Sequence, residues 1–349
     1  MPEKILVRAT NWVGDVVMST PALSAIKKNF PDSTVTVLVK PPLNELFQQN
    51  PAVDDVILYD RKRLYKGPTG LARLAWELRG RKFDRAILLQ NAFEAALVSF
   101  LANIPVRMGY STDGRGMLLT HPVKVKEETR KKHQVHYYIE MLSSLGLKAD
   151  DPTPRLYLGA TDEALADGLL AGFAGPDDLI VGVNPGAQYG EAKRWPPERF
   201  GAVADKLIAA HGARVVILGG PGDIGAASAV EASMKGRALN LAGKTSVRAL
   251  MGVIGRLSLF ITNDSGPMHV AAALGTPTVA LFLSTDHIAT GPFSQKAKVV
   301  REPVTCSPCL KRTCPDGSYA CMEKVTADRV YNTALELMEE TVGVPSRIP

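Results

Sequence analysis

Residues 262–282, TNDSGPMHVAAALGTPTVALF, decide the fold class of the chain. The stretch starts at the end of a hydrophobic run, turns at a polar corner, continues as an alanine-rich helix and ends in another β-branched run. Strand, helix and strand in this order form the unit from which parallel sheets with crossover helices are built. Asn263, Asp264 and Ser265 stand where the strand meets the helix, at the edge of such a sheet where ligands bind.

The same alternation runs through both halves of the chain. The strand-like runs include KILVR, TVTVLV and RAILLQ in the first half, and LIVGVNPGA, ARVVILGG and PTVALF in the second. Residues 148–160 contain helix breakers and no helical period, which predicts a linker. We therefore predict an α/β protein with two Rossmann-like, doubly wound domains at 1–150 and 160–325, followed by a C-terminal helix and tail at 326–349. The carboxyl ends of both sheets are expected to face one cleft.

Composition and charge narrow the classes of partner. The 349 residues are 46% hydrophobic, which is enough for two cores. The N-terminus lacks a signal-peptide pattern and no run of eighteen apolar residues occurs, so a cytoplasmic protein is expected. Nine Lys or Arg lie between Arg61 and Arg85, either as a solvated helix face or as a surface for an anionic partner. Nucleic acid is the weaker partner because no nucleic-acid-binding motif accompanies the charge.

The first corner with possible chemistry is RATNWVGDVV at residues 8–17. Asp15 begins the helix that follows the first strand, and such an acid is often only a cap or a first-turn residue stabilised by the helix dipole. A carboxylate at this edge is also able to accept a proton from an attacking hydroxyl group. Both interpretations of Asp15 remain open from the sequence.

Two further corners lie in the second half. In VNPGAQYGEAKRW, Lys193 and Arg194 are predicted to neutralise phosphate oxygens, whereas Trp195 is predicted to pack with Phe200. In ILGGPGDIG, Asp223 is either an N-cap or an acceptor of hydrogen bonds from sugar hydroxyls.

The fourth corner is the opening stretch. If the helix begins near Ser265, its free N–H groups and positive dipole end suit a diphosphate. Gly266 permits close approach, and Pro267 fits the first helical turn. His269 is either a packed core histidine or a donor to phosphate.

Four cysteines, Cys306, Cys309, Cys314 and Cys321, share one loop with the spacing C-x2-C-x4-C-x6-C. In a cytoplasmic protein this clustering favours a structural zinc knuckle over disulfides, although the spacing is not an established zinc pattern. The sequence leaves open whether a metal binds, and any such metal is expected to be structural.

Three motifs in order, NWVGDVVMSTPAL, NPGAQYGEAKRWP and NDSGPMHVAAALGTPTVALF, resemble those of the bacterial ADP-heptose:lipopolysaccharide heptosyltransferases, most closely the heptosyltransferase II group. The resemblance implies a B-type glycosyltransferase fold, with the acceptor bound by the N-terminal half and the nucleotide sugar by the C-terminal half. It implies inverting transfer of L-glycero-D-manno-heptose from ADP-heptose to the heptosyl-Kdo inner core of lipopolysaccharide. The acceptor is then a Kdo-lipid A at the cytoplasmic face of the inner membrane, which the protein contacts peripherally.

The resemblance also implies roles for single residues. Asp15 corresponds to the general base, Lys193 to a lysine that stabilises the diphosphate, and Asp223 to an acid near the donor. The donor-binding loop is expected to comprise Asp264, Ser265, Gly266, Met268 and His269, with Asp264 holding heptose hydroxyls and main-chain amides holding phosphate. No D-x-D acid pair stands at a strand end, so the helix N-terminus and Lys193 are expected to stabilise the leaving ADP, with no cofactor required.

Other functions fit the same pattern less well. A heptosyltransferase I would add the first heptose to Kdo itself. A nucleotide-sugar 2-epimerase uses a similar pair of domains but needs no lipid-facing basic surface. A binding protein with two lobes would show affinity without turnover.

Overall fold

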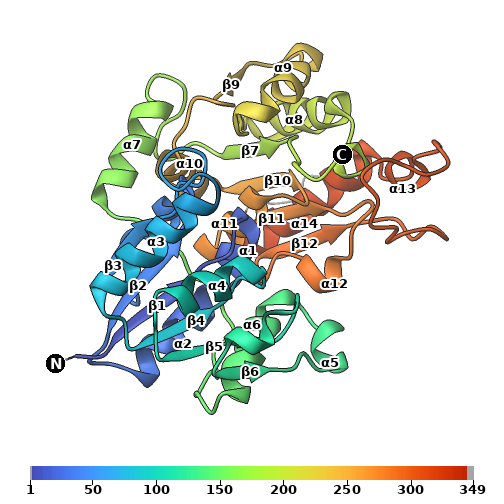
Figure 1. Ribbon diagram of the computed structural model, residues 1–349. Helices are drawn as coiled ribbons and strands as arrows, with labels where there is room; N and C mark the ends of the chain where they lie inside the picture. Colours follow the sequence, from blue (N-terminus) through green and yellow to red (C-terminus); the bar gives the residue numbers. More distant parts are fainter. Residues whose placement is uncertain (1, 344–349) are drawn as a thin grey trace. The chain divides into compact units, whose positions relative to one another are not determined.

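The computed structural model describes residues 2–343 and divides into two compact units, Met1–Tyr157 and Leu158–Pro349 (Figure 1). The boundary lies in the irregular segment that precedes residue 160, where the sequence predicts a linker. Each unit contains one six-stranded sheet in which every pair of neighbouring strands is parallel. The predicted α/β class with two doubly wound sheets is confirmed.

The first unit has the strand order β3-β2-β1-β4-β5-β6. Its elements are β1 (Lys4–Arg8), α1 (Val13–Met18), α2 (Thr20–Asn29), β2 (Thr34–Val39), a 3-10 helix (Leu43–Phe47), β3 (Asp55–Leu58), α3 (Gly67–Arg81), β4 (Arg85–Leu88), α4 (Phe93–Leu101), β5 (Val106–Tyr110), a 3-10 helix (Arg115–Leu118), β6 (His121–Val123), α5 (Glu127–Arg130) and α6 (Gln134–Ser144). The central strand β1 is buried at Ile5, Leu6 and Val7, as expected for a strand covered on both faces.

The second unit has the order β12-β11-β10-β7-β8-β9, which is the same topology counted from its own first strand. Its elements are α7 (Ala160–Leu170), β7 (Ile180–Asn184), a 3-10 helix (Glu191–Lys193), α8 (Pro197–His211), β8 (Arg214–Ile217), a 3-10 helix (Pro221–Asp223), α9 (Ile224–Ser233), β9 (Ala238–Asn240), α10 (Val247–Gly255), β10 (Leu259–Asn263), α11 (Gly266–Leu274), β11 (Thr278–Leu281), α12 (His287–Thr290), β12 (Ala297–Val300), α13 (Ala320–Glu323) and α14 (Ala327–Val342). Helix α14 packs on this sheet, with Val330, Ala334 and Met338 in the core. Residues 344–349 of the predicted tail lie outside the described part.

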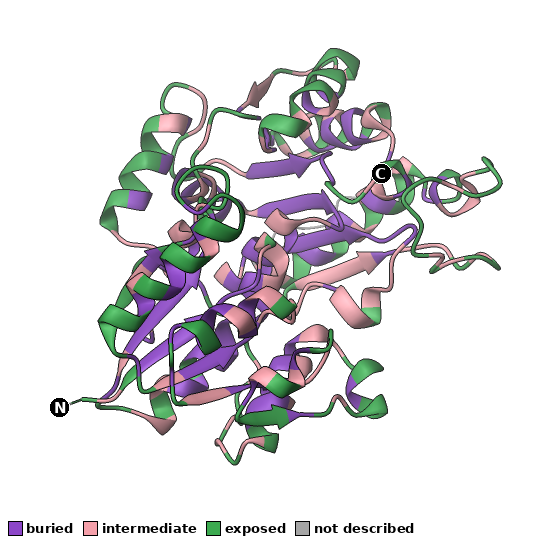
Figure 2. Ribbon diagram, in the orientation of Figure 1, coloured by how far each residue is buried: buried purple, intermediate pink, exposed green. Residues whose placement is uncertain are grey.

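In both units the strand order reverses beside the first strand. Strand β1 pairs with both β2 and β4, and β7 pairs with both β8 and β10. Loops leaving such a point diverge to opposite faces of the sheet, which opens a crevice at the carboxyl ends of the strands. Figure 2 shows the strands at the centre of both sheets as buried. Within residues 2–343, every helix is too short or too polar to span a bilayer.

Candidate functional site

The corner after β10 leads directly into helix α11. Ser265 is the N-cap residue in extended conformation, and helix α11 begins at Gly266 with Pro267 in its first turn. The Ser265 side chain does not cap the helix. The first N–H groups of α11 are therefore left for another acceptor, as the sequence predicts for an anion site.

Lys193 and Asp264 form a buried ion pair beside this helix start. Lys193 Nζ lies 2.5 Å from Asp264 Oδ2, and the two side chains are 14% and 6% exposed. Thr285, in the segment after β11, donates from Oγ1 to the same Oδ2 at 2.6 Å. Sequence reasoning missed Thr285, because it lies 21 residues from Asp264 and its neighbours show no local pattern. The loops after β7, β10 and β11 thus meet at the Asp264 carboxylate. We name Lys193, Asp264, Thr285 and the start of helix α11 the α11 corner.

Asparagine side chains fix the loop after β7 to the α11 corner. Asn184 Nδ2 donates to Ser265 Oγ at 3.0 Å and to Thr262 Oγ1 at 3.1 Å. Asn263 Nδ2 donates to the Pro185 carbonyl at 2.8 Å, and its Oδ1 accepts the Trp195 N–H. These hydrogen bonds hold Ser265 and the chain around Lys193 in place before any ligand arrives.

Trp195 is fully buried and packs edge-on against Phe200, with ring centroids 5.0 Å apart, which confirms its predicted structural role. Its indole Nε1 donates to the Val325 carbonyl at 2.9 Å. The residue after Arg194 therefore anchors the loop to the core rather than to a ligand.

Asp223 lies against the same loop. A Cβ atom on Gly186 would lie 2.2 to 2.5 Å from the Asp223 carboxyl group, so any other residue at position 186 would displace that side chain. Asp223 Oδ2 accepts the Gly220 N–H at 3.0 Å, and the side chain makes no capping bond to helix α9. Asp223 therefore occupies the N-cap position of α9, but its carboxylate bonds to the preceding 3-10 turn instead of to that helix, and it stands next to the loop that leads to Lys193.

Two buried polar atoms in the loops that build the α11 corner lack a protein partner. Among residues 2–343 these are Asn184 Oδ1 and Ser284 Oγ, and both residues are 1% exposed. Buried polar atoms of folded proteins are nearly always hydrogen-bonded to protein, water or ligand. Both atoms are accordingly candidates for a hydrogen bond to a bound molecule.

Met268 and His269 are buried in helix α11. The Met268 side chain is fully buried with Ala280 and Phe282, so only its main chain is open to a ligand. His269 is 5% exposed, one turn inside the helix. Burial of both residues matches a helix that packs along its length on the sheet.

Asp15 belongs to the first unit, in the first turn of helix α1 after strand β1. Its carboxylate lies close enough to Tyr138 to affect the hydroxyl group: burial first, and the Asp15 charge second, raise the pKa of Tyr138 well above its ordinary value. Asp15 is partly exposed, as a proton acceptor for a substrate has to be.

Cations cluster at the carboxyl ends of β1 and β2 in the first unit. Arg8 is buried, lies 5.3 Å from the Tyr59 ring centroid, and has a pKa lowered to about 10 mainly by burial. Burial, followed by the charges of Arg8 and Arg61, lowers the pKa of Lys40. Glu94 balances part of this charge through Arg61 at 2.9 Å. Sequence reasoning missed Arg8 and Lys40, because each is a single cation at a strand end.

Helix α3 carries three cations of the basic run, Arg73, Arg79 and Arg81, and an exposed tryptophan. Trp76 is 76% exposed, with Arg73 and Arg79 one turn away on either side. Figure 2 shows the outer face of α3 and the turn before it as exposed. Leu64, in that turn, is 54% exposed and is flanked by Arg63.

The four cysteines have free thiols. Burial raises the pKa of the Cys321 thiol, and the other three cysteines lie near enough to contribute. In the described range 2–343, no three His, Cys, Asp or Glu side chains are grouped so that they could hold a metal. In the described residues, the cysteines therefore do not form a preassembled zinc site.

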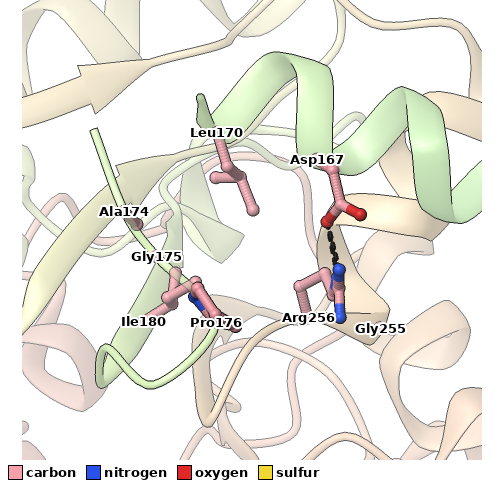
Figure 3. A pocket seen from close by; sticks show the side chains of 8 residues that line it. All are labelled: Asp167, Leu170, Ala174, Gly175, Pro176, Ile180, Gly255 and Arg256. Carbon is pink, nitrogen blue, oxygen red and sulfur yellow. Dashed lines mark hydrogen bonds and ion pairs between the residues drawn. The ribbon is translucent and has the colours of Figure 1, made fainter. Parts of the chain in front are cut away.

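A pocket lies at the amino ends of the strands of the second sheet, at the end opposite to the α11 corner. It is lined by residues from α7, the start of β7 and the end of α10, and Arg256 Nε donates to Asp167 Oδ1 at 2.9 Å along one side of it (Figure 3). Ile180 is the first residue of β7, so this pocket is at the amino ends of the strands. It contains none of the predicted site residues.

Comparisons with known proteins agree with this geometry. The sequence pattern of Glycosyltransferase family 9 (heptosyltransferase) matches residues 71–320. The chain is 31% identical to Lipopolysaccharide heptosyltransferase 2 of Salmonella typhimurium, over 97% of this chain and 99% of that protein.

Two solved structures are similar over almost the whole chain. Escherichia coli ADP-heptose lps heptosyltransferase II has a TM-score of 0.82 at 28% identity, covering 97% of this chain and 99% of its own. A glycosyl transferase family 9 protein from Veillonella parvula has a TM-score of 0.88 at 27% identity, covering 97% and 98%. With two parallel Rossmann-like sheets and this extent of similarity, the chain belongs to glycosyltransferase family 9, the heptosyltransferases.

Proposed function

We propose that this protein transfers L-glycero-D-manno-heptose from ADP-heptose to the heptosyl-Kdo inner core of lipopolysaccharide, adding the second heptose. The observation that carries the proposal is the α11 corner, where a buried lysine and a free helix start stand together. Relatives named heptosyltransferase 2 support the choice of the second heptose over the first.

In this proposal the second unit binds the donor. The diphosphate lies at the start of α11, where main-chain N–H groups and Ser265 face it and Lys193 offsets its charge. Asp264 holds Lys193 through Oδ2 and leaves Oδ1 for a hydroxyl group of the heptose. Asp223 contacts the donor from the neighbouring loop.

Asp15 of the first unit acts as the general base. It accepts the proton of the acceptor hydroxyl as that oxygen attacks the anomeric carbon from the face opposite the leaving ADP, which inverts the configuration. A carboxylate in the first turn of a helix is a weak base, so proton transfer is late and follows the growth of oxocarbenium character on the sugar. The leaving ADP gains charge that Lys193 and the α11 N–H groups stabilise, and the transfer requires no cofactor.

The acceptor is an anionic glycolipid, and the first unit offers cations for it. Lys40 lies near Arg8 and Arg61, and its pKa is lowered by burial first and by the positive charges of these two arginines second. A carboxylate or phosphate of the Kdo region relieves that repulsion when it binds.

The proposal includes peripheral contact with the cytoplasmic face of the inner membrane. Tryptophan prefers the interface between water and lipid, and arginines on either side of Trp76 favour anionic headgroups. The acceptor lipid resides in such a membrane, so this surface brings the enzyme to its substrate.

An assay of ADP release tests the proposed function. Purified protein is mixed with ADP-heptose and either heptosyl-Kdo-lipid A or Kdo-lipid A. We expect rapid ADP release only with the heptosylated acceptor. Preference for Kdo-lipid A would identify a first-heptose enzyme, and conversion of ADP-heptose without acceptor would identify an epimerase.

A further inference from the structure

The loop that carries Lys193 is fastened to residues 301–319 between β12 and α13. These residues include Cys306, Cys309 and Cys314, whereas Cys321 lies in α13, and we name them the cysteine loop. The Ala192 N–H donates to the Arg312 carbonyl at 3.0 Å, and the Tyr189 hydroxyl donates to the Leu310 carbonyl at 2.9 Å. A Cβ on Gly190 would lie 2.4 Å from the same Arg312 carbonyl oxygen. The two segments are thus in direct main-chain contact, and Arg312 is fixed beside the loop of Lys193.

The cysteine loop is also fastened to the segment after β11. The Leu310 N–H donates to the Ser284 carbonyl at 2.8 Å, and Ser307 Oγ donates to the Leu283 carbonyl at 2.8 Å. Leu310 has a φ of +54°, which L-residues rarely adopt, while its side chain is 56% exposed. Main-chain contacts therefore hold Leu310 in this conformation, and they join it to the segment that supplies Thr285 to Asp264.

Tyr189 presents one ring to two cations. Lys193 Nζ lies 5.2 Å from the ring centroid and Arg312 Cζ lies 5.4 Å from it. Cations at this distance are attracted to the face of an aromatic ring. Tyr189 is itself hydrogen-bonded to the cysteine loop, so both cations lie within 5.4 Å of the centroid of a ring that this loop holds.

The charges of the two cations are balanced differently. Lys193 is paired with Asp264, so together they carry little net charge. Within residues 2–343, Arg312 contacts the Tyr189 ring but is in ion-pair distance of no carboxylate, and its side chain is exposed. A diphosphate needs more positive charge than Lys193 supplies. A guanidinium group with unused N–H donors binds phosphate oxygens in a bidentate manner.

We propose that Arg312 is a second cation for the diphosphate of ADP-heptose, and that Tyr189 is its positioning residue. This inference rests on the proposed transfer from ADP-heptose. The cysteine loop then takes part in donor binding through Arg312, which its main-chain contacts hold in place. This role does not depend on whether the thiols are free or bound.

Calorimetric titration of the full chain with ADP, AMP and adenosine tests the assignment. Arg312→Ala is expected to weaken ADP binding about 10- to 100-fold, as for a lost charge-assisted hydrogen bond. In the same variant the affinity for AMP is expected to fall less, and the affinity for adenosine is expected to stay unchanged. Arg312→Lys is expected to recover part of the ADP affinity. Lys311→Ala is the matched control: it removes a neighbouring exposed cation and should leave all three affinities unchanged.

Tyr189 is tested through its coupling to Arg312. Tyr189→Leu removes the ring, and we expect the double variant with Arg312→Ala to bind ADP no more weakly than Arg312→Ala alone within about threefold. Losses that multiply in the double variant would show that Tyr189 does not act through Arg312 and would overturn its positioning role.

Two results overturn the Arg312 assignment: ADP affinity in Arg312→Ala within twofold of the wild type, or an equal loss for adenosine, which would indicate damage to the fold. Wild-type turnover of ADP-heptose separates this inference from the proposed function. If the wild type turns over and Arg312→Ala binds ADP normally, only the Arg312 assignment fails. A wild type that binds no ADP overturns both.

Discussion

Lys193 Nζ lies 2.5 Å from Asp264 Oδ2, and both side chains are largely buried. The pair joins the loop after β7 to the start of helix α11, so a cation and a helix start are placed together without a ligand. The carboxylate holds the lysine at the cost of offsetting its charge. The two residues consequently have different expected effects on ADP binding.

Lys193→Ala is expected to weaken ADP and ADP-heptose binding about 10- to 100-fold, because it removes a charged donor to phosphate. Asp264→Asn is expected to bind ADP at least as tightly as the wild type, because it removes a negative charge beside the diphosphate. Calorimetric titration with ADP measures both. Equal losses in the two variants would contradict separate roles for the lysine and the carboxylate.

Asp15→Asn is expected to lower kcat by at least two orders of magnitude while ADP-heptose affinity stays near normal, because the amide has no basic oxygen for the acceptor proton. Steady-state kinetics together with a binding titration measure the two effects. A variant that keeps most of its turnover would remove Asp15 from the role of general base.

Lys40→Ala is expected to raise KM for the glycolipid acceptor about 10-fold with little change in KM for ADP-heptose, because it removes a cation that lies near Arg8 and Arg61 in the first unit. Lys28→Ala, which removes an exposed lysine from helix α2, is the matched control. If KM for the acceptor is the same in both variants, the cluster around Lys40 does not bind the acceptor.

Trp76→Ala is expected to reduce co-sedimentation with vesicles that contain anionic phospholipid several-fold, because the indole ring is lost from the lipid interface. Vesicles of neutral lipid should bind little of either protein, and raised salt should weaken the binding that remains. Met117→Ala is the control, since Met117 is 85% exposed in the same unit but lies outside helix α3. If the Trp76 variant and the wild type bind anionic vesicles equally, the exposed face of helix α3 does not contact the membrane.

Asp162→Asn is expected to lower the free energy of unfolding by about 3 to 5 kcal/mol, because it removes the carboxylate charge that pairs with the buried Arg248 guanidinium. The hydrogen bond from Arg248, above all, lowers the pKa of Asp162. A carboxyl group with a lowered pKa stabilises the fold above the unfolded-state value of about 3.9, and that contribution is lost as the pH falls through the folded-state pKa.

Urea unfolding at pH 7 and near pH 3 measures this effect, and the difference between variant and wild type should shrink at the lower pH. Asp167→Asn is the control on the same helix, because its pair with Arg256 is exposed and should contribute less than about 1 kcal/mol. Similar losses for the two variants would show that burial of the Asp162 pair does not matter.

Much of the fold was predictable because it depends on local patterns. The buried strands β1, β2, β7 and β10 read as continuous β-branched runs, and such runs indicate parallel strands covered on both faces. Of the edge strands, β3 and β9 were predicted from the runs DVILY and ALNLAG, but β6 and β12 were not. Strand β6 has three residues, one of them proline, and β12 is only half-buried along most of its length. Helix α7 was also missed, since its apolar residues do not form a clear stripe.

The site was predictable where a single corner contains its chemistry. Asp264, Ser265 and Gly266 follow a strand and begin a helix, so their neighbours in sequence reveal the anion site. Thr285 and Arg312 were not predicted, because each reaches the α11 corner or its loop only through the packing of distant segments. A contact between loops leaves no period or spacing in the sequence of either one.

The three tryptophans of the chain lie in three different environments. Trp195 is fully buried and its main-chain N–H donates to Asn263, which precedes Asp264. Trp12 is 63% exposed just before the helix of Asp15, and Trp76 is exposed on α3. Indole emission depends on the polarity around the ring, so each residue is an intrinsic fluorescent probe of one of these environments. With single tryptophan-to-phenylalanine changes, the unlabelled enzyme can report donor, acceptor and lipid binding as separate optical signals.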